Sequence, residues 1–126
     1  MMTSQSRCLL IAVTALLVSA ATPAFAVAPT AEANGPYTIA EGTVAVLSAL
    51  GSTDSDGVIS QYEWDCDSDG SFEGTGVAFV GCVFGDDGTF VVTLRVTDDS
   101  GAQDTDTANV VVSNVAPTIV SHLVPG

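Results

Sequence analysis

Residues 88 to 98 read GTFVVTLRVTD, and this stretch decides the fold class. From Phe90 to Val96 every second side chain is apolar, and the positions between are mixed. The apolar parity consists of Phe90, Val92, Leu94 and Val96. A period of two residues is typical of a β-strand with one buried face. The sequence therefore predicts a strand over 88–98.

A second alternating segment follows after a short turn. Residues 98–101 read DDSG, which favours a turn because Asp and Ser side chains hydrogen-bond to nearby backbone groups. The alternation resumes in residues 108–113, ANVVVS, with its alanine and two valines on one parity. We expect the two segments to pair as a hairpin that ends near Asn114.

Three shorter segments also look like strands, at residues 44–49, 58–66 and 78–84. Turns rich in Asp and Gly, at 52–57 and 85–88, separate them. The first segment is apolar on both parities, so its inward face stays ambiguous. No convincing helical period appears beyond the N-terminal segment. Short strands spaced by such turns indicate an all-β, antiparallel sandwich.

The first 26 residues are expected to be a secretory signal peptide. Arg7 precedes an apolar run over 8–18, and Ala24-Phe25-Ala26 is an A-x-A pattern with cleavage after Ala26. This run is too short to cross a bilayer as a helix, which takes about 20 residues. The mature form is therefore predicted to lie outside the cytosol without membrane insertion.

The chain is strongly acidic. It carries 15 acidic residues against two basic ones, a net charge of −13, and it has no lysine. Arg7 is lost with the signal peptide, which leaves Arg95 as the one basic side chain. Such a surface repels phosphates and anionic lipid headgroups, so no nucleic acid partner is expected. Eleven of the 15 acids are Asp, which favours turns.

Two cysteines remain after cleavage, Cys66 and Cys82. Both fall on the parities assigned to the core, on different strands, and Trp64 shares the parity of Cys66. In an oxidising compartment an even pair favours a disulfide, here closing a loop that would stabilise the fold by roughly 3 kcal/mol. The alternative is two free buried thiols, because Cys packs well as a small hydrophobe. Trp64 is predicted to be a core residue.

The stretch YEWDCDSDG, residues 62–70, spaces its aspartates like an EF-hand calcium loop. Its oxygen ligands would be Asp65, Asp67, Asp69 and Glu73. Position 12 of that loop is Gly76, where a bidentate Glu is required, so the EF-hand interpretation fails. A looser structural calcium site at the four acids stays open, and no other cofactor is expected.

A second acidic cluster competes for the same role. It consists of Asn34, Asp54, Asp56, Asp98 and Asp99. The alternative for both clusters is that the aspartates form tight turns and Asx caps with solvated charges. If the strand containing Trp64 continued through the first cluster, its three aspartates would share one face and repel strongly unless a cation or a turn intervened.

Catalysis has little support in this sequence. The only histidine is His122, near the C-terminus, and the remaining cysteines are best used in a disulfide. Nucleophilic arrangements of the Ser-His-Asp or Cys-His type therefore lack a base in the predicted domain. We expect the domain not to be an enzyme.

A repeated tetrapeptide marks the domain boundaries. Val27-Ala28-Pro29-Thr30 recurs as Val115-Ala116-Pro117-Thr118, 88 residues later. The first copy begins the predicted sandwich and the second follows its last strand. We expect a domain over 27–114, with 115–126 as the start of a truncated second repeat in a tandem array.

These motifs resemble the PKD (polycystic kidney disease) domain family over about residues 28 to 116. Residues 62–70 are similar to the W-D-F-x-x-D-G signature of the family. The other matching stretches, in order, are Asn34-Gly35-Pro36-Tyr37, Glu41-Gly42, Ser52-Thr53-Asp54-Ser55-Asp56-Gly57, Gly88-Thr89-Phe90, 92–98 and Asn114-Val115-Ala116-Pro117. Cys66 departs from the family, which usually has Phe there. The lost ring would leave a costly void, for which pairing with Cys82 is an obvious compensation.

The resemblance implies an immunoglobulin-like β-sandwich of about seven strands in a secreted or cell-surface protein. Such domains serve as spacers and adhesive modules beside secreted proteases, chitinases and other polysaccharide-degrading enzymes. The expected function is non-catalytic: spacing, adhesion, or contact with extracellular proteins, polysaccharides or adjacent repeats. The alternative is a calcium-stabilised carbohydrate-binding accessory domain of an extracellular hydrolase.

Overall fold

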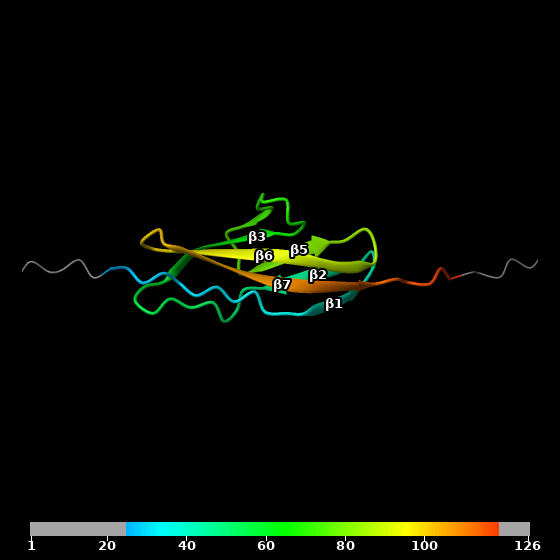
Figure 1. Cartoon of the computed structure of the whole chain (residues 1–126), viewed down its shortest axis with the longest axis horizontal. Coiled ribbons are helices and arrows are strands. Elements are labelled where there is room, and N and C mark those ends of the chain that lie inside the picture. Colours follow the sequence, from blue (N-terminus) through cyan, green and yellow to red (C-terminus); the bar gives the residue numbers. More distant parts are fainter. Residues whose placement is uncertain (1–24, 119–126) are drawn as a thin grey trace, which may run out of the picture.

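The computed structural model describes residues 25–118, and these form a two-layer β-sandwich (Figure 1). Residues 1–24 of the expected signal peptide, His122 and most of the expected second repeat lie outside these residues. The described part has seven strands and no helix. The strands are β1 (Tyr37–Ala40), β2 (Val44–Ser48), β3 (Ile59–Asp65), β4 (Gly74–Thr75), β5 (Phe79–Val83), β6 (Gly88–Asp98) and β7 (Gln103–Ser113).

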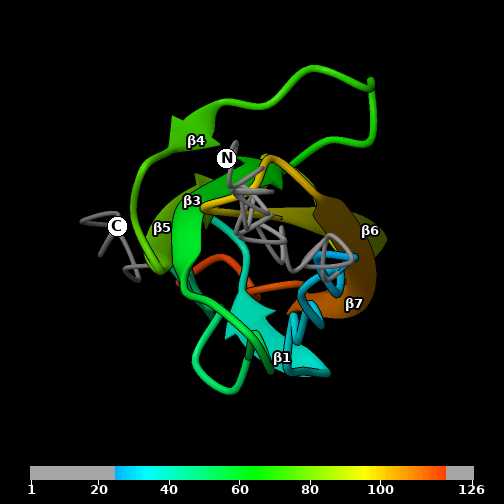
Figure 2. The same cartoon turned by 90° about the vertical axis from the view of Figure 1, so that its left-hand side faces the viewer.

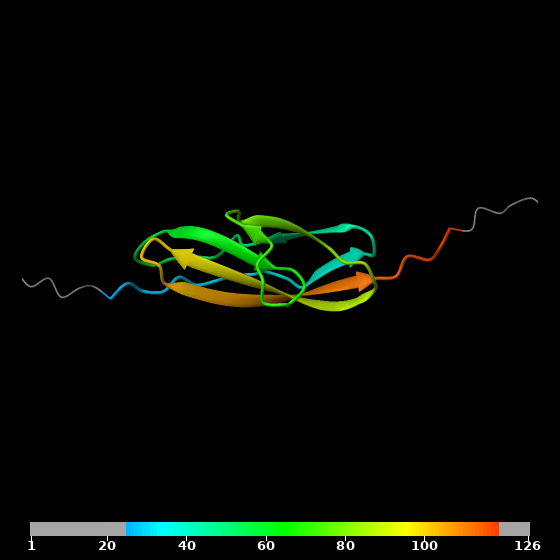
Figure 3. The same ribbon diagram turned by 90° about the horizontal axis from the view of Figure 1, so that it is seen from above.

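The larger layer is a five-stranded sheet in the order β1-β7-β6-β3-β4, and the smaller one pairs β2 with β5. All pairs are antiparallel except β1 and β7, which run parallel. The sandwich is elongated along its strands (Figure 3). The predicted all-β, immunoglobulin-like class is confirmed.

The β6–β7 hairpin is the longest ladder, running from the Gly88–Val112 pair to the Thr97–Gln103 pair. The sequence predicted it, but β7 begins five residues earlier than the apolar alternation indicates. Asp104 and Asp106 occupy half-buried positions there. Their Oδ2 atoms accept hydrogen bonds from the backbone N–H groups of Ala31 and Ala33, both at 2.8 Å. The sequence did not predict this half of the strand because its inward-facing side chains, which bind a neighbouring segment, are charged and not apolar.

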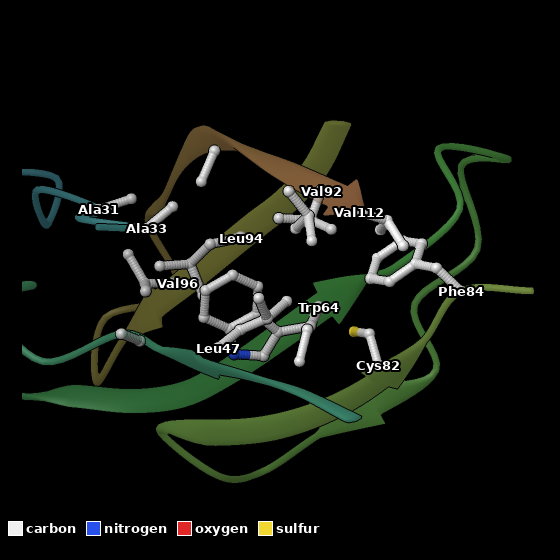
Figure 4. Packing of buried hydrophobic residues seen from close by; sticks show 14 residues of the cluster. Ala31, Ala33, Leu47, Trp64, Cys82, Phe84, Val92, Leu94, Val96 and Val112 are labelled. Atoms are coloured by element: carbon white, nitrogen blue, oxygen red, sulfur yellow. The ribbon is translucent and has the colours of Figure 1, made fainter. Parts of the chain in front are cut away.

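The core lies between the two sheets around Trp64, which is fully buried. Ala31 and Ala33 lie toward one end of this core, and Cys82 and Phe84 toward the other (Figure 4). The buried hydrophobic residues are Ala31, Ala33, Ala45, Leu47, Ala49, Trp64, Cys82, Phe84, Val92, Leu94, Val96, Ala108, Val110 and Val112. The indole N–H has no acceptor among the described residues, so Trp64 stabilises the fold through apolar burial.

Packing resolves the ambiguous face of β2. Ala45 and Leu47 point into the core, whereas Val44 and Val46 are 55% and 63% exposed. The inward side chains of β2 cover Trp64 and the valines of β6 from the opposite layer. The sequence alone could not choose between the parities because both are apolar.

A disulfide joins Cys66 to Cys82, with the two Cα atoms 5.9 Å apart. It connects the segment after β3, in the large sheet, to β5 in the small one. The predicted pairing is confirmed. The bond ties the two layers together at the position where the family usually places Phe, so the smaller side chain is anchored covalently.

The chain before β1 is held by a close contact and a bridging hydroxyl. Gly35 has φ +104°, and a Cβ at this position would come within 2.9 Å of the Cβ of Ala108. The Tyr37 hydroxyl donates to the carbonyl of Ala33 (2.7 Å) and accepts from the N–H of Ser48 (3.0 Å). Tyr37 therefore links β1 to β2 across the layers.

The inward face of β2 predicts that truncating Leu47 destabilises the domain far more than truncating its neighbour Val46. Leu47→Ala should lower the free energy of unfolding by about 2–5 kcal/mol, because it leaves a cavity beside Trp64. Val46→Ala, on the outer face, should change it by less than about 1 kcal/mol. Urea unfolding followed by Trp64 fluorescence measures both. Equal losses for the two variants would contradict the observed parity.

Candidate functional site

The segment between β3 and β4 stands out from the body of the sandwich (Figure 2) and carries the predicted calcium ligands. Asp65 ends β3, is only 4% exposed, and organises the loop. Its Oδ1 accepts hydrogen bonds from the N–H groups of Asp67 (3.2 Å) and Ser68 (2.7 Å), and its Oδ2 accepts one from Gly70 (2.9 Å). The strand ends here because the carboxylate turns the backbone around itself.

Glu73 closes the loop against β3. Its N–H donates to the carbonyl of Trp64, and its carboxylate accepts from the N–H of Cys66, both at 2.9 Å. One carboxylate oxygen from each of the four acids, Asp65, Asp67, Asp69 and Glu73, lies within 4.8 Å of the others. The loop therefore brings the predicted set together, although the strand does not continue as one extended face.

Repulsion among these carboxylates is visible at Asp67. The N–H of Asp69 hydrogen-bonds to Asp67 and lowers its pKa. Desolvation and the negative charges of Asp69, Glu73 and Asp65 act in the opposite direction, and the pKa of Asp67 is raised overall. A hard cation that accepts oxygen ligands, such as Ca²⁺, would relieve this repulsion.

The second predicted cluster forms in part. Asp54 and Asp99 meet at Gly57, where a Cβ would collide with both carboxylates. The pKa of Asp54 is raised, chiefly by burial and also by the charge and side chain of Asp56 and the charge of Asp98. A hydrogen bond from the Asp56 N–H acts in the opposite direction. The Oδ2 atom of Asp54 has no hydrogen-bond partner among residues 25–118.

Asn34 does not join this second cluster, contrary to expectation. Its side-chain amide donates to the carbonyl oxygens of Ser48 (2.7 Å) and Leu50 (2.8 Å). The amide therefore fixes the turn after β2. The sequence could not show this because those two carbonyls approach Asn34 only after the layers pack.

Asp98 is a buried turn residue of the β6–β7 hairpin. Its Oδ1 accepts hydrogen bonds from the Ser100 hydroxyl (2.7 Å) and from the N–H groups of Ser100 and Ala102 (both 2.8 Å). The Ser100 hydroxyl, together with the backbone N–H groups, lowers the pKa of Asp98 against the effect of burial. This is the Asx-type cap that the alternative interpretation of the aspartates predicts.

The described residues offer little for acid–base catalysis. Residues 25–118 contain neither His nor Lys, so carboxylates are the main groups left to act as a base. Those of the β3–β4 loop and the hairpin turn already accept backbone hydrogen bonds. In this part of the chain, no helix has the length and apolarity to span a membrane.

A family model described as PKD domain matches residues 26–112, which is most of the described chain. The chain belongs to the PKD domain family. The immunoglobulin-like sandwich and the motif around Trp64 agree with this membership. PKD domains are generally non-catalytic accessory modules.

Solved structures are similar to this PKD domain. The PKD1 domain of the Vibrio cholerae metalloprotease PrtV is 31% identical, with a TM-score of 0.50, over 69% of this chain and 99% of that one. The PKD1 domain of Vibrio anguillarum Epp is 28% identical, with a TM-score of 0.51, over 71% and 98%.

A third similar structure comes from carbohydrate-binding modules of the β-sandwich superfamily with promiscuous specificity. It is 33% identical, with a TM-score of 0.63, and the match covers 71% of this chain. This chain spans only 36% of that chain.

One surface of the PKD domain was missed by the sequence reasoning. The outer face of the β2–β5 sheet carries no charge, and we call it the β2–β5 face. It consists of Val44, Val46, Ser48, Phe79, Gly81 and Val83. The apolar character of β2 on both parities was the signal, but only the pairing with β5 shows that the second parity continues as a surface.

The lowered pKa of Asp98 predicts a pH-dependent contribution to stability. Ionised Asp98 stabilises the folded state above its ordinary pKa of 3.8. That stabilisation is lost as the pH falls through the lower pKa of the folded state. Asp98→Asn should therefore be destabilised at neutral pH, and its deficit against wild type should shrink on acidification. Urea unfolding at a series of pH values measures the deficit.

Asp99→Asn is the matched control, because it removes a charge from the exposed neighbouring position. A deficit of Asp98→Asn that stays constant from neutral pH to below the ordinary pKa of Asp would contradict the assignment. So would an equal, equally pH-dependent deficit in Asp99→Asn.

Proposed function

We propose that this domain is a non-catalytic extracellular module that spaces the segments on either side of it. The observation that carries the proposal is the position of its two ends. The described chain enters the sandwich at one end of its long axis and leaves at the opposite end (Figures 1 and 3). A module of this shape extends a multidomain chain in a line.

Both connecting segments are tied to the domain by the same kind of bond. The N–H of Val27 donates to Asp56 (2.9 Å), and the N–H of Val115 donates to Glu41 (3.2 Å). Val27 and Val115 each begin one copy of the repeated V-A-P-T tetrapeptide. This supports the further proposal that a second repeat begins at Val115, 88 residues after the first.

An extracellular location has two supports. Disulfides such as Cys66–Cys82 persist in oxidising compartments and are rare in the cytosol. The apolar run and A-x-A pattern of residues 1–26 are the features of a secretory signal. The acidic surface suits a soluble spacer, because net charge keeps neighbouring modules apart.

A second candidate function is that of a calcium-stabilised carbohydrate-binding accessory domain. Two observations favour it: the convergence of four carboxylates in the β3–β4 loop, and the uncharged β2–β5 face. The similarity to a chain from carbohydrate-binding modules points the same way. The exposed apolar side chains of this face, Phe79 among them, would contact the apolar faces of sugar rings, while calcium would hold the loop.

The spacer proposal predicts the shape of a two-module chain. In a protein where residues 27–114 are followed directly by a second copy of 27–114, the modules should lie end to end. Small-angle X-ray scattering should then give a maximum dimension nearly double that of the single module. A compact particle with the modules side by side would contradict the proposal. The single module measured alone is the control.

The calcium proposal predicts a stabilised melt. Calcium at 100 times its dissociation constant should add about 2.7 kcal/mol to the free energy of unfolding, and a chelator should remove it. Asp69→Asn should reduce the shift at a fixed calcium concentration, because it removes one of the four ligand charges. The Asp69 carboxylate accepts only one backbone hydrogen bond, from the N–H of Ser71. Thermal unfolding with and without calcium measures this. An unchanged wild-type melt would refute calcium binding.

Asp87→Asn, on the exposed β5–β6 turn, is the matched control and should keep the calcium shift. Retention on insoluble chitin or cellulose tests the sugar contact separately. Wild type and Val91→Ser, on the outer face of the other sheet, should be retained, and Phe79→Ser should not. If the wild-type domain is not retained on chitin or cellulose, the carbohydrate-binding proposal is refuted and the spacer proposal stands.

A further inference from the structure

A pocket of about 380 Å³ opens beside the disulfide, between the β3–β4 loop and the β5–β6 turn. It is lined by Cys66, Asp67, Glu73, Val83, Phe84, Gly85, Asp86 and Phe90. Its volume falls in the range of about 300–1,000 Å³ that small-molecule sites occupy. The spacer function makes no use of it, although Val83 also belongs to the β2–β5 face and Asp67 and Glu73 also belong to the proposed calcium site.

The apolar part of the pocket is preformed. The rings of Phe84 and Phe90 pack with their centroids 4.8 Å apart, and Phe84 is only 5% exposed. Cys66 is fixed by its bond to Cys82. Phe90 lies in β6, and Phe84 and Cys66 directly follow β5 and β3, so packing and the disulfide hold this wall in place before a ligand binds.

Three carboxylates surround this apolar wall, and they come from two separate elements. Asp67 and Glu73 belong to the β3–β4 loop, and Asp86 belongs to the β5–β6 turn. Glu73 accepts one hydrogen bond, from Cys66, and no bond to the Asp86 side chain is present among the described residues. The pocket therefore combines aromatic surface with unneutralised negative charge.

The described chain has no cation of its own to offer the pocket. Arg95 is the only basic side chain in residues 25–118. Its Nε donates to Glu63 at 2.6 Å, and its guanidinium lies 3.9 Å from the centroid of the Phe72 ring. A Phe ring and a carboxylate together therefore hold a guanidinium elsewhere in this same domain, and the pocket repeats that pair of groups with an open volume in place of the arginine.

We propose that this pocket binds an arginine side chain of a partner protein. The guanidinium would meet Asp86, Asp67 and Glu73, and the aliphatic stem would lie against Phe84 and Phe90. Arginine fits better than a hydrated metal ion, because three of the eight lining residues, Val83, Phe84 and Phe90, are apolar and cannot supply ligands. The inference goes beyond the spacer function and does not rest on it.

The test is an NMR titration of the intact domain with N-acetyl-arginine amide, in a buffer of low ionic strength that contains a chelator. The expected result is saturable shifts in the millimolar range, centred on Gly85, Asp86 and the Phe84 and Phe90 rings. The matching citrulline derivative has the same shape without the charge. It should bind at least about tenfold more weakly, because the charge-assisted contacts are lost.

Three variants locate the site. Gly85→Leu should abolish the shifts by filling the pocket. A Cβ at Gly85 meets no atom within 4 Å, so the fold should tolerate the change. Asp86→Asn should weaken binding by about two- to fivefold, as the loss of one exposed ion pair does, and Asp87→Asn next to it should not. Retained amide dispersion in each variant checks folding.

The opposing outcomes are equally distinct. Shifts spread over all acidic turns, or equal effects of Asp86→Asn and Asp87→Asn, would reduce the binding to general charge attraction and overturn the proposal. If the citrulline derivative binds as tightly as the arginine derivative, the carboxylates do not recognise the charge and the proposal is refuted. Stronger binding of glucosamine than of arginine would assign the pocket to an amino sugar. The absence of saturable shifts would leave the spacer function intact and refute the pocket.

Discussion

Hydrogen bonds from backbone N–H groups to carboxylates organise this acidic domain. Ordinary proteins pair many of their acids with Lys or Arg, but in residues 25–118 Arg95 is the one basic side chain against 15 acidic residues, and it pairs with Glu63. Asp65 folds the β3–β4 loop, Asp98 caps the β6–β7 hairpin, and Asp104 fastens the chain before β1 to β7. Such charge-assisted bonds stabilise an ionised acid without a basic partner.

This arrangement links the fold to the proposed functions. The same type of bond fixes the connecting segments at both ends, through Asp56 and Glu41, and so sets the direction in which neighbouring segments leave the sandwich. In the β3–β4 loop four carboxylates lie so close together that they repel one another even though they accept N–H bonds, and three acids surround the adjacent pocket. A calcium ion or a partner's arginine would add stability there.

The replacement of the family's usual Phe by Cys66 has a local structural meaning. A disulfide to Cys82 ties the loop to β5, whereas a ring at this position would occupy space between the layers. Cys66 and the Phe84–Phe90 pair now form the wall of the pocket. The acidic loop is thereby held against the sandwich by one covalent bond and by the hydrogen bonds of Asp65 and Glu73.

The sequence by itself determined the all-β class and the β6–β7 hairpin, because a period of two residues is a local signal. It predicted the burial of Trp64 and favoured the pairing of Cys66 with Cys82, which the structure confirms. It also named the four acids that the β3–β4 loop gathers. It missed β1 and β4, which are too short to show a period, and the first half of β7, whose acids face another segment. Only tertiary packing chose the inward face of β2, moved Asn34 away from the second acidic cluster and built the pocket. Each of these depends on contacts between the two layers, and contacts between residues far apart in the chain leave no pattern within either segment.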